Sequence, residues 1–334
     1  MQTLLKKSNI LSSKFIPDFL FPTTPLQFLN LSRTKVKNNY KISVHREIIG
    51  KNGVCLDWVK YNEINNEKNP ILVIFPGLTG SVKDTYIFNI INESIIKGKF
   101  NTCIFQMRLL NENVKIDKRY LFLIDDIDEA LNEIIKKYGS NKKIYAIGFS
   151  YGANQLVKYL GQKNNKIKKI NAAVSISNPF EIIVCTRFSR DKIYDRLLTE
   201  FFKKVLLRTK KNIEKMGIDT NKILKTNSMT EVGNLYSAKV FGYTDVDDYY
   251  RGVSSVLDIK NVNVPLLCLN AKDDKICFEE SFPYEEIIRN KNIGTIWTSH
   301  GTHNCFIEHY GLFGVRQWAP TQAINFLKAV NDNN

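Results

Sequence analysis

The chain has 334 residues, with 48 Lys and Arg against 33 Asp and Glu and a formal net charge of +15. Apolar residues make up 43% of the chain and recur along its length, which excludes an intrinsically disordered protein. No stretch approaches the roughly 18 uncharged apolar residues that a membrane-spanning helix needs. The six cysteines form no CxxC pair and no zinc-binding spacing, which indicates reduced thiols. We therefore expect a cytoplasmic protein, soluble or peripheral to a membrane, without a signal peptide.

The excess of positive charge lies mainly in lysines beside asparagines and predicts a solvated surface. No nucleic-acid-binding module is present, so no nucleic-acid partner is expected. Two zones are densely basic: residues 158–169 have five lysines and no acids, and residues 187–225 have twelve basic against five acidic residues. The second zone also contains apolar residues, which either pack inward or face an anionic membrane at its periphery. The sequence leaves both alternatives open.

From residue 40 onward, strand patterns alternate with helical ones, which is typical of an α/β sheet. Residues 40–49 and 54–61 flank Gly-Lys-Asn-Gly and predict a hairpin. Helical spacing of apolar residues over 84–97 and 121–138 supplies crossovers of the length that parallel strands need. The other predicted strands are apolar runs, expected to be buried on both faces: 71–75, 102–105, 144–147, 172–176, 266–269 and 295–298.

This alternation predicts a mostly parallel sheet of about eight strands with helices on both faces. Residues 1–39 form an N-terminal arm in this interpretation, and 40–330 form one α/β domain. Within it, 179–255 contain no convincing core strand. We expect this stretch to be a helical cap inserted over the carboxyl edge of the sheet, where ligands bind in open α/β folds.

The most informative motif is Gly-Phe-Ser-Tyr-Gly at 148–152, directly after a strand pattern and before a helix. This context is the one that a nucleophile elbow requires. The sharp turn strains the backbone of the serine, and the flanking glycines avoid side-chain collisions with the neighbouring strand and helix. Ser150 is therefore the predicted nucleophile, at a helix N-terminus that favours a developing oxyanion.

A serine hydroxyl needs a base that is oriented by an acid, and α/β-hydrolases supply them in the order serine, acid, histidine. Asp273 and Asp274 follow one downstream strand, and His300 and His303 follow the next. Spacing alone leaves both choices open. The other two histidines are expected elsewhere, His45 half-buried in an early strand and His309 in a surface helix.

Several short segments, found in order over roughly residues 15–328, together make up one recognisable pattern. They are Leu56–Trp58, Pro76–Ser81, Gly148–Asn154, Lys158–Gly161, Ser175–Phe180, Phe241–Tyr243, Tyr249–Arg251, Asn270–Asp274 and Gly301–Phe306. Together they resemble the YheT-like branch of the α/β-hydrolases, which are esterases and lipases that include abhydrolase-domain acylglycerol and phospholipid lipases. The resemblance implies an α/β-hydrolase fold. It also implies His303 as the base, Asp274 as the acid, and an oxyanion hole formed by the backbone N–H groups of Leu78 and Tyr151.

Two departures from the family pattern concern the shape of the substrate site. Gln106–Asn111 keeps an arginine but lacks the family's glycines, and Thr302 replaces a glycine beside the base. The resulting hypothesis is a serine hydrolase that cleaves acyl-lipid or smaller carboxylic esters through an acyl-enzyme, without metal or organic cofactor. The alternatives are an acyltransferase or thioesterase with the same triad, and a non-catalytic binding protein with a hydrolase fold.

Overall fold

The computed structural model describes residues 1–8, 15–18, 26–27, 30–35, 42–49, 53–61, 67–78, 80–106, 123–162, 169–188, 192–310 and 314–333. The predicted hairpin turn at 50–52 and the family-divergent loop 107–111 lie outside these residues, as does Thr79 of the Pro76–Ser81 segment.

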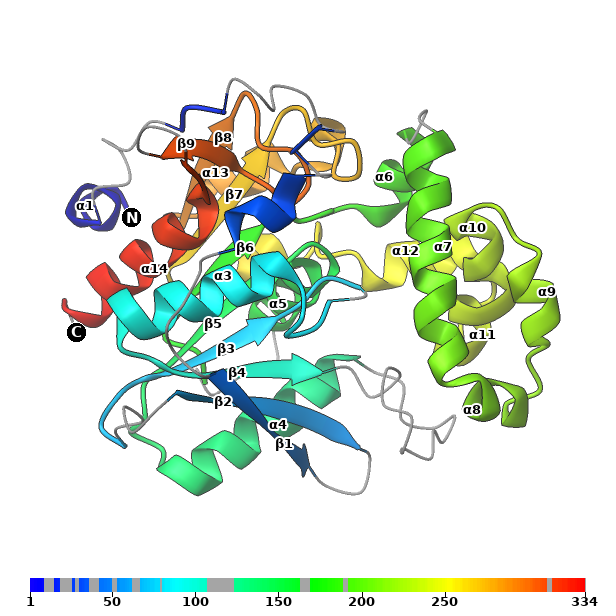
Figure 1. The fold of residues 1–334 in the computed structure, drawn as a ribbon, viewed down its shortest axis with the longest axis horizontal. Helices are drawn as coiled ribbons and strands as arrows, with labels where there is room; N and C mark the ends of the chain where they lie inside the picture. Colours follow the sequence, from blue (N-terminus) through cyan, green and yellow to red (C-terminus); the bar gives the residue numbers. More distant parts are fainter. Residues whose placement is uncertain are drawn as a thin grey trace.

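A single eight-stranded sheet forms the centre of the molecule, in the order β1-β2-β4-β3-β5-β6-β7-β8 (Figure 1). β2 pairs antiparallel with both β1 and β4, and every other neighbouring pair is parallel. The predicted α/β-hydrolase sheet is therefore confirmed. Its strands are β1 (Ile42–Ile49), β2 (Val54–Tyr61), β3 (Ile71–Phe75), β4 (Asn101–Gln106), β5 (Ile144–Phe149), β6 (Ala172–Ile176), β7 (Leu266–Ala271) and β8 (Ile293–Thr298).

Helices cover both faces of this sheet, because alternate residues of each strand point to opposite sides. On one face, Ile71 and Val73 belong to the hydrophobic core that includes α4 (Leu123–Tyr138) and α5 (Tyr151–Gly161). On the other, the core includes Leu72 and Ile74. The helices that contribute to this second core are α1 (Gln2–Lys7), α3 (Thr85–Glu93) with its π-helical continuation η3 (Ser94–Gly98), and α14 (Trp318–Asn331).

Smaller elements complete this domain. A two-stranded sheet, β9 (Ile307–Tyr310) and β10 (Gly314–Gln317), follows the last strand of the large sheet. His309 therefore lies in a strand, and the prediction of a surface helix is wrong, because residues 307–310 pair antiparallel with 314–317. The remaining short elements are η1 (Leu31–Thr34), η6 (Ile259–Asn261), η7 (Glu279–Ser281) and α13 (Tyr284–Arg289).

Between β6 and β7 the chain forms a group of helices, named the inserted helices below, that stands beside the sheet (right side of Figure 1). They have a small core of their own, which includes Phe202, Leu206, Ile213 and Tyr236. Their bounds are α6 (Ile182–Phe188), α7 (Lys192–Arg208), α8 (Lys210–Lys215), α9 (Thr220–Leu224), α10 (Met229–Val232), η5 (Gly233–Ser237), α11 (Ala238–Phe241) and α12 (Val246–Val253). We propose that residues 179–255 form a cap within a 40–330 domain. Across the described parts of the chain, no helix combines the length and apolar content needed to cross a bilayer.

Candidate active site

Ser150 lies in the sharp turn between β5 and α5, with φ 52° and ψ −123°. A positive φ strains a residue that carries a side chain, at a cost of about 1–3 kcal/mol. The flanking glycines make this turn possible. A Cβ on Gly148 would lie 2.5 Å from Cα of Ala153, and one on Gly152 would lie 2.2 Å from the carbonyl oxygen of Pro76. The Gly-x-Ser-x-Gly sequence is thus a steric requirement of this turn.

A chain of hydrogen bonds runs from Ser150 to a buried carboxylate. Nε2 of His303 lies 2.8 Å from Oγ of Ser150, and Nδ1 of the same ring lies 2.9 Å from Oδ2 of Asp274. Oδ1 of Asp274 accepts the backbone N–H groups of Ile276 and Cys277 at 2.8 and 3.0 Å. These two amides fix the carboxylate, and the carboxylate fixes the imidazole with Nε2 toward the serine.

The alternative acid and base occupy different positions. Nδ1 of His300 lies 3.9 Å from Oδ2 of Asp273, and the His300 side chain is 46% exposed. Oδ1 of Asp273 accepts the backbone N–H of Thr302 at 2.8 Å. Partial burial raises the pKa of Asp273. Asp273 therefore holds the backbone of the histidine loop, whereas Asp274 contacts the imidazole of His303.

The loop that carries His303 has a strained backbone held by specific contacts. Positive φ values occur at Gly301 (144°), Thr302 (51°), Asn304 (62°) and Phe306 (44°). The N–H of Phe306 donates to the carbonyl of Gly301 at 2.7 Å, and that of Asn304 donates to Oγ of Ser177 at 3.1 Å. At Thr302 the positive φ is unfavourable for a β-branched residue.

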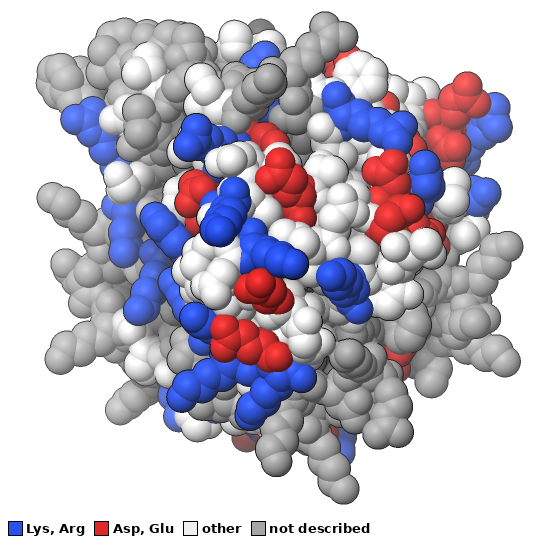
Figure 2. All heavy atoms as spheres, turned by 90° about the vertical axis from the view of Figure 1, so that its right-hand side faces the viewer, with Lys and Arg blue, Asp and Glu red and all other residues white. Residues whose placement is uncertain are grey.

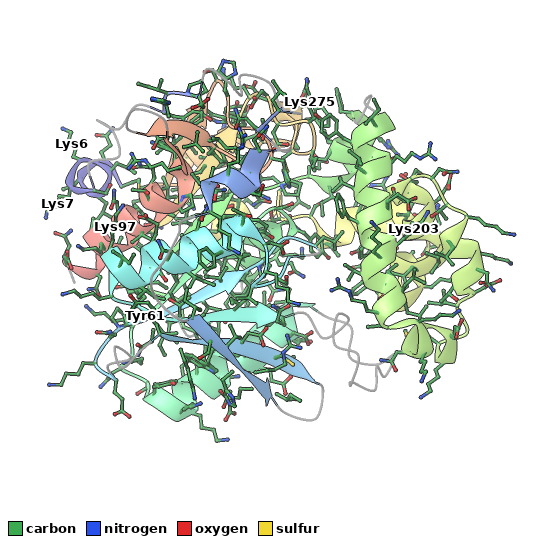
Figure 3. All side chains as sticks on the ribbon, viewed as in Figure 1. Lys6, Lys7, Tyr61, Lys97, Lys203 and Lys275 are labelled. Atoms are coloured by element: carbon green, nitrogen blue, oxygen red, sulfur yellow. The ribbon has the colours of Figure 1, made fainter. Side chains whose placement is uncertain are left out.

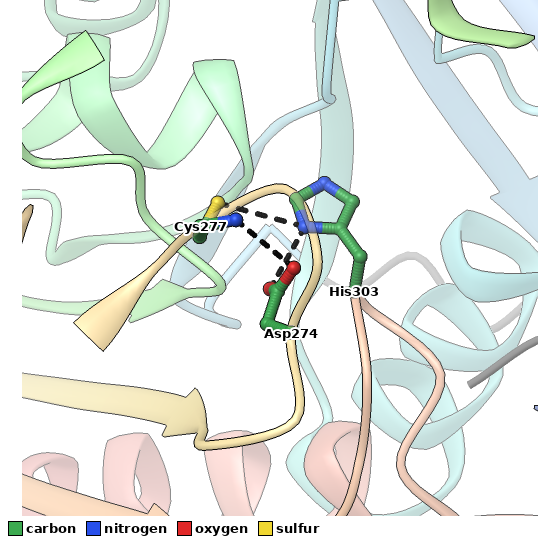
Figure 4. A group of neighbouring side chains, drawn as sticks. All are labelled: Asp274, Cys277 and His303. Carbon is green, nitrogen blue, oxygen red and sulfur yellow. Dashed lines mark hydrogen bonds and ion pairs between the residues drawn. The ribbon is translucent and has the colours of Figure 1, made fainter. Parts of the chain in front are cut away.

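Cys277 is a neighbour of Asp274 and His303 that sequence reasoning missed (Figure 4). Its Sγ donates to the carbonyl of Ser177 at 3.0 Å and lies 3.5 Å from Nδ1 of His303. Asp274, Cys277 and His303 offer donor atoms within 4.8 Å of one another, a spacing that can hold a metal ion. Burial raises the pKa of the Cys277 thiol well above its ordinary value, which favours the protonated form. In the sequence, the only indication of this contact is that Cys277 follows Asp274 by three residues.

Of the two predicted oxyanion donors, one belongs to the elbow and the other to the segment that follows β3. Tyr151 is the first residue of α5, and Leu78 follows Gly77, where a Cβ would lie 3.4 Å from Cβ of Ser150. Gly77 is held by a hydrogen bond from its N–H to the hydroxyl of Tyr86 at 3.2 Å. Within the described parts of the chain, the N–H groups of Leu78 and Tyr151 donate to no other group.

A cavity of about 130 Å³ lies between these donors and the inserted helices. Its lining is mostly apolar, and the charged residues along it are Asp195 and Lys275. Lys275 is labelled in Figure 3. The inserted helices are anchored here by Asn154, whose side chain donates to the carbonyl of Val253 at 2.7 Å and accepts the N–H of Ser255 at 2.9 Å. The cavity lining includes Leu78, Tyr151, Ile182, Tyr194, Leu198, Phe202, Met229, Tyr249 and Ile276.

The remaining predicted positions lie away from this site. His45 is exposed on β1, so the expectation of a half-buried residue is wrong. It lies in the antiparallel edge strand, most of whose residues are exposed. Nδ1 of His309 lies 3.2 Å from Oδ2 of Asp18. All six cysteines are free and buried, as expected for reduced thiols.

Residues 70–216 match a sequence family described as alpha/beta hydrolase fold. The chain is 28% identical to human phospholipase ABHD3 over 265 residues, which cover 76% of this chain and 64% of that protein. It is 28% identical to a monoacylglycerol lipase of Saccharomyces cerevisiae over 282 residues, which cover 80% of this chain and 61% of the lipase. The chain therefore spans less than two thirds of the length of these relatives.

Among solved structures, the esterase Est1E of Butyrivibrio proteoclasticus with bound ferulic acid has a similar fold. The TM-score is 0.54 at 14% sequence identity, and the match covers 86% of this chain and 99% of that chain. An identity this low supports a shared fold alone.

Proposed function

We propose that the chain is an abhydrolase-domain esterase or lipase and that it hydrolyses carboxylic esters of acyl lipids. The observation that carries the proposal is the hydrogen-bonded series of Ser150, His303 and Asp274, with separations of 2.8 and 2.9 Å. An assembled series of this kind supports a catalytic protein over a binding protein with the same fold.

In the proposed mechanism, Oγ of Ser150 attacks the ester carbonyl while Nε2 of His303 takes its proton. Asp274 holds the tautomer that presents Nε2 to the serine and stabilises the imidazolium. The negative charge on the substrate oxygen is stabilised by the N–H groups of Leu78 and Tyr151, each contributing about 3–4 kcal/mol if it resembles a measured oxyanion donor.

Collapse of this tetrahedral intermediate breaks the ester C–O bond. His303 returns its proton to the leaving alcohol, and the acyl group stays on Oγ of Ser150. Water then attacks the acyl-enzyme with His303 again as base, which releases the carboxylic acid and restores the serine. None of these steps requires a group outside the chain and its substrates.

The lipid substrate class is supported by two independent observations. The relatives are named phospholipase and monoacylglycerol lipase. The cavity beside Leu78 and Tyr151 is lined mostly by apolar side chains, and at about 130 Å³ it is close in size to an engineered apolar cavity of roughly 150 Å³ that holds benzene. An acyl chain of several carbons is the kind of group that such a lining would receive from a substrate held at Ser150.

Labelling with a fluorophosphonate, followed by a panel of lipid esters, tests the proposal. The wild-type protein should be labelled and should cleave acylglycerol or phospholipid esters, and Ser150→Ala should lose both properties while keeping its circular dichroism spectrum. Labelling that persists in Ser150→Ala would contradict the assignment of the nucleophile. Acyl transfer to added glycerol or ethanol in preference to water would instead identify an acyltransferase.

A further inference from the structure

Helix α7 carries two sets of apolar residues, one that lines the cavity and one that is partly exposed to solvent. Tyr194, Leu198 and Phe202 occur at intervals of four residues and line the cavity. Leu197 and Phe201, also four residues apart, are each 45% exposed. Because residues four apart share a side of a helix, these two sets form neighbouring stripes along α7. Other exposed apolar residues of this region are Phe188 (39%), Ile193 (69%) and Leu207 (38%).

The sequence did not decide whether the apolar residues of the basic zone 187–225 pack inward or face outward, and their exposure in the structure separates them into these two groups. Phe202, Val205 and Leu206 are buried and pack inward, as an ordinary cap requires. Phe201 and Leu207 face solvent. An exposed stripe of large apolar residues on a soluble protein marks an interaction surface more often than isolated exposed residues do.

Cations accompany this outward stripe. Arg196, Lys204, Arg208 and Lys211 are exposed, and within the described residues none of them forms an ion pair. Nζ of Lys204 lies 5.8 Å from the centre of the Phe201 ring. Figure 2 faces the inserted helices and shows Lys and Arg side chains around much of this side of the molecule, with acidic side chains between them.

Lys203 differs from these four cations. It is 5% exposed, and its Nζ contacts the carbonyl of Thr226 at 2.7 Å and the carboxylate of Glu200 at 2.8 Å (Figure 3). Nζ of Lys210 also has a partner, the carboxylate of Glu214 at 3.6 Å. Lys203 therefore holds the inserted helices together, and its charge is not presented to a partner.

We propose that the outward face of α7 and the start of α8, defined by Leu197, Phe201, Lys204 and Arg208 of α7 and Lys211 of α8, docks on the surface of an anionic lipid bilayer. Apolar side chains enter the boundary between headgroups and acyl chains, and the cations beside them contact anionic headgroups. The formal charge of +15 attracts the whole protein to such a surface.

A bilayer is favoured over a protein partner because of what the neighbouring stripe of the same helix lines. Leu198 and Phe202, adjacent in sequence to Leu197 and Phe201, line the cavity beside the proposed oxyanion hole. Docking through the outward stripe brings this cavity to the surface that supplies acyl lipids. In this respect the inference rests on the proposed function, although the binding itself does not require catalysis.

Vesicle co-sedimentation of Ser150→Ala tests docking without turnover of the lipid. Phosphatidylcholine vesicles are compared with vesicles that contain about 30% phosphatidylserine, at low and at high salt. Two variants alter the proposed face: Leu197→Ser with Phe201→Ser, and Lys204→Glu with Arg208→Glu and Lys211→Glu. The matched controls are Leu257→Ser with Ile288→Ser, at positions 73% and 80% exposed, and Lys60→Glu with Lys260→Glu and Lys291→Glu, at other exposed positions.

We expect binding that requires phosphatidylserine and falls with added salt. Either change to the face should weaken it by about tenfold or more, and the controls should weaken it much less. The Leu197 and Phe201 variant, with Ser150 retained, should still hydrolyse a water-soluble ester, because neither side chain lines the cavity.

The docking proposal is wrong if Ser150→Ala does not bind anionic vesicles, or if the face and control variants bind equally. It is also wrong if the same face instead mediates association of two copies, detected by light scattering and abolished in Leu197→Ser with Phe201→Ser. Failure of the proposed function has a different signature, namely loss of fluorophosphonate labelling at Ser150 with vesicle binding retained.

Discussion

Asp273 accepts the backbone N–H of Thr302 at 2.8 Å, one residue before His303. Its neighbour Asp274 contacts the imidazole itself, with Oδ2 2.9 Å from Nδ1. Two adjacent carboxylates thus hold the same loop, Asp273 through the backbone of Thr302 and Asp274 through the imidazole of His303. This division of roles makes their effects on activity separable.

Replacement of each carboxylate by its amide should show the difference. In Asp274→Asn we expect kcat to fall by about 10⁴-fold, because the amide favours the wrong tautomer of His303. Asp273→Asn should lower kcat by about tenfold or less, since an amide oxygen can still accept the N–H of Thr302. Steady-state kinetics on one soluble ester measures both changes. Equal losses would show that the two side chains do not have separate roles.

The two histidines provide a second comparison. His303→Ala should lower kcat by about three to four orders of magnitude, and adding Ser150→Ala should cause little further loss, because members of one triad act together. His300→Ala should have a small effect, because its side chain is 46% exposed and its nearest acid is 3.9 Å away. The four variants are compared on one substrate. If His300→Ala instead lowers kcat by several orders of magnitude, the base has been assigned to the wrong residue.

The sheet could be predicted from the sequence because its signals are local. Ile71–Phe75, for example, is an unbroken apolar run followed by Pro-Gly, and it is the buried strand β3 with the predicted bounds. The elbow was also predictable, because the glycines on either side of Ser150 are required by contacts with residues nearby in sequence or in the adjoining strand. The prediction of a helix at His309 failed because strand pairing with residues 314–317 is not visible in the local pattern.

Other features depend on distant contacts that spacing does not reveal. The choice between His300 and His303 depends on how a strained loop crosses the sheet edge, and only the family resemblance favoured His303 in the sequence. Cys277 was missed because its contacts are with Ser177 and His303, which lie 100 and 26 residues away. The outward stripe of α7 could not be distinguished from a packing face, because its apolar residues adjoin buried ones in the sequence.

The anchoring role of Asn154 can be measured as stability. Its side chain is fully buried and joins α5 to the end of α12 through Val253 and Ser255. Asn154→Ala leaves the buried carbonyl of Val253 without this donor, whereas the N–H of Ser255 keeps a second acceptor, the carbonyl of Phe180 at 3.0 Å. We expect the free energy of unfolding in urea to fall by about 1–3 kcal/mol. The control Asn132→Ala, at an exposed position of α4, should change it by about 0.5 kcal/mol or less. If the two variants are equally stable, the bridge does not anchor the inserted helices.

The buried thiols predict how stability changes at alkaline pH. Burial raises the pKa of Cys185 and Cys305 to about 12, and it raises that of Cys277 well above its ordinary value. An unfolded thiol ionises near pH 8.5, so above that pH the unfolded chain loses protons that the folded chain keeps.

The stabilisation is complete below the unfolded pKa and is lost as the pH rises toward the folded pKa, so the free energy of unfolding should decrease. Between pH 7.5 and pH 10 we expect a decrease of about 2 kcal/mol for each of Cys185 and Cys305 in urea titrations, since one pKa unit is worth about 1.4 kcal/mol. Cys185→Ala with Cys305→Ala should show a smaller decrease over the same interval than the wild-type protein. An unchanged pH dependence in that double variant would show that these two thiols do not remain protonated in the folded state.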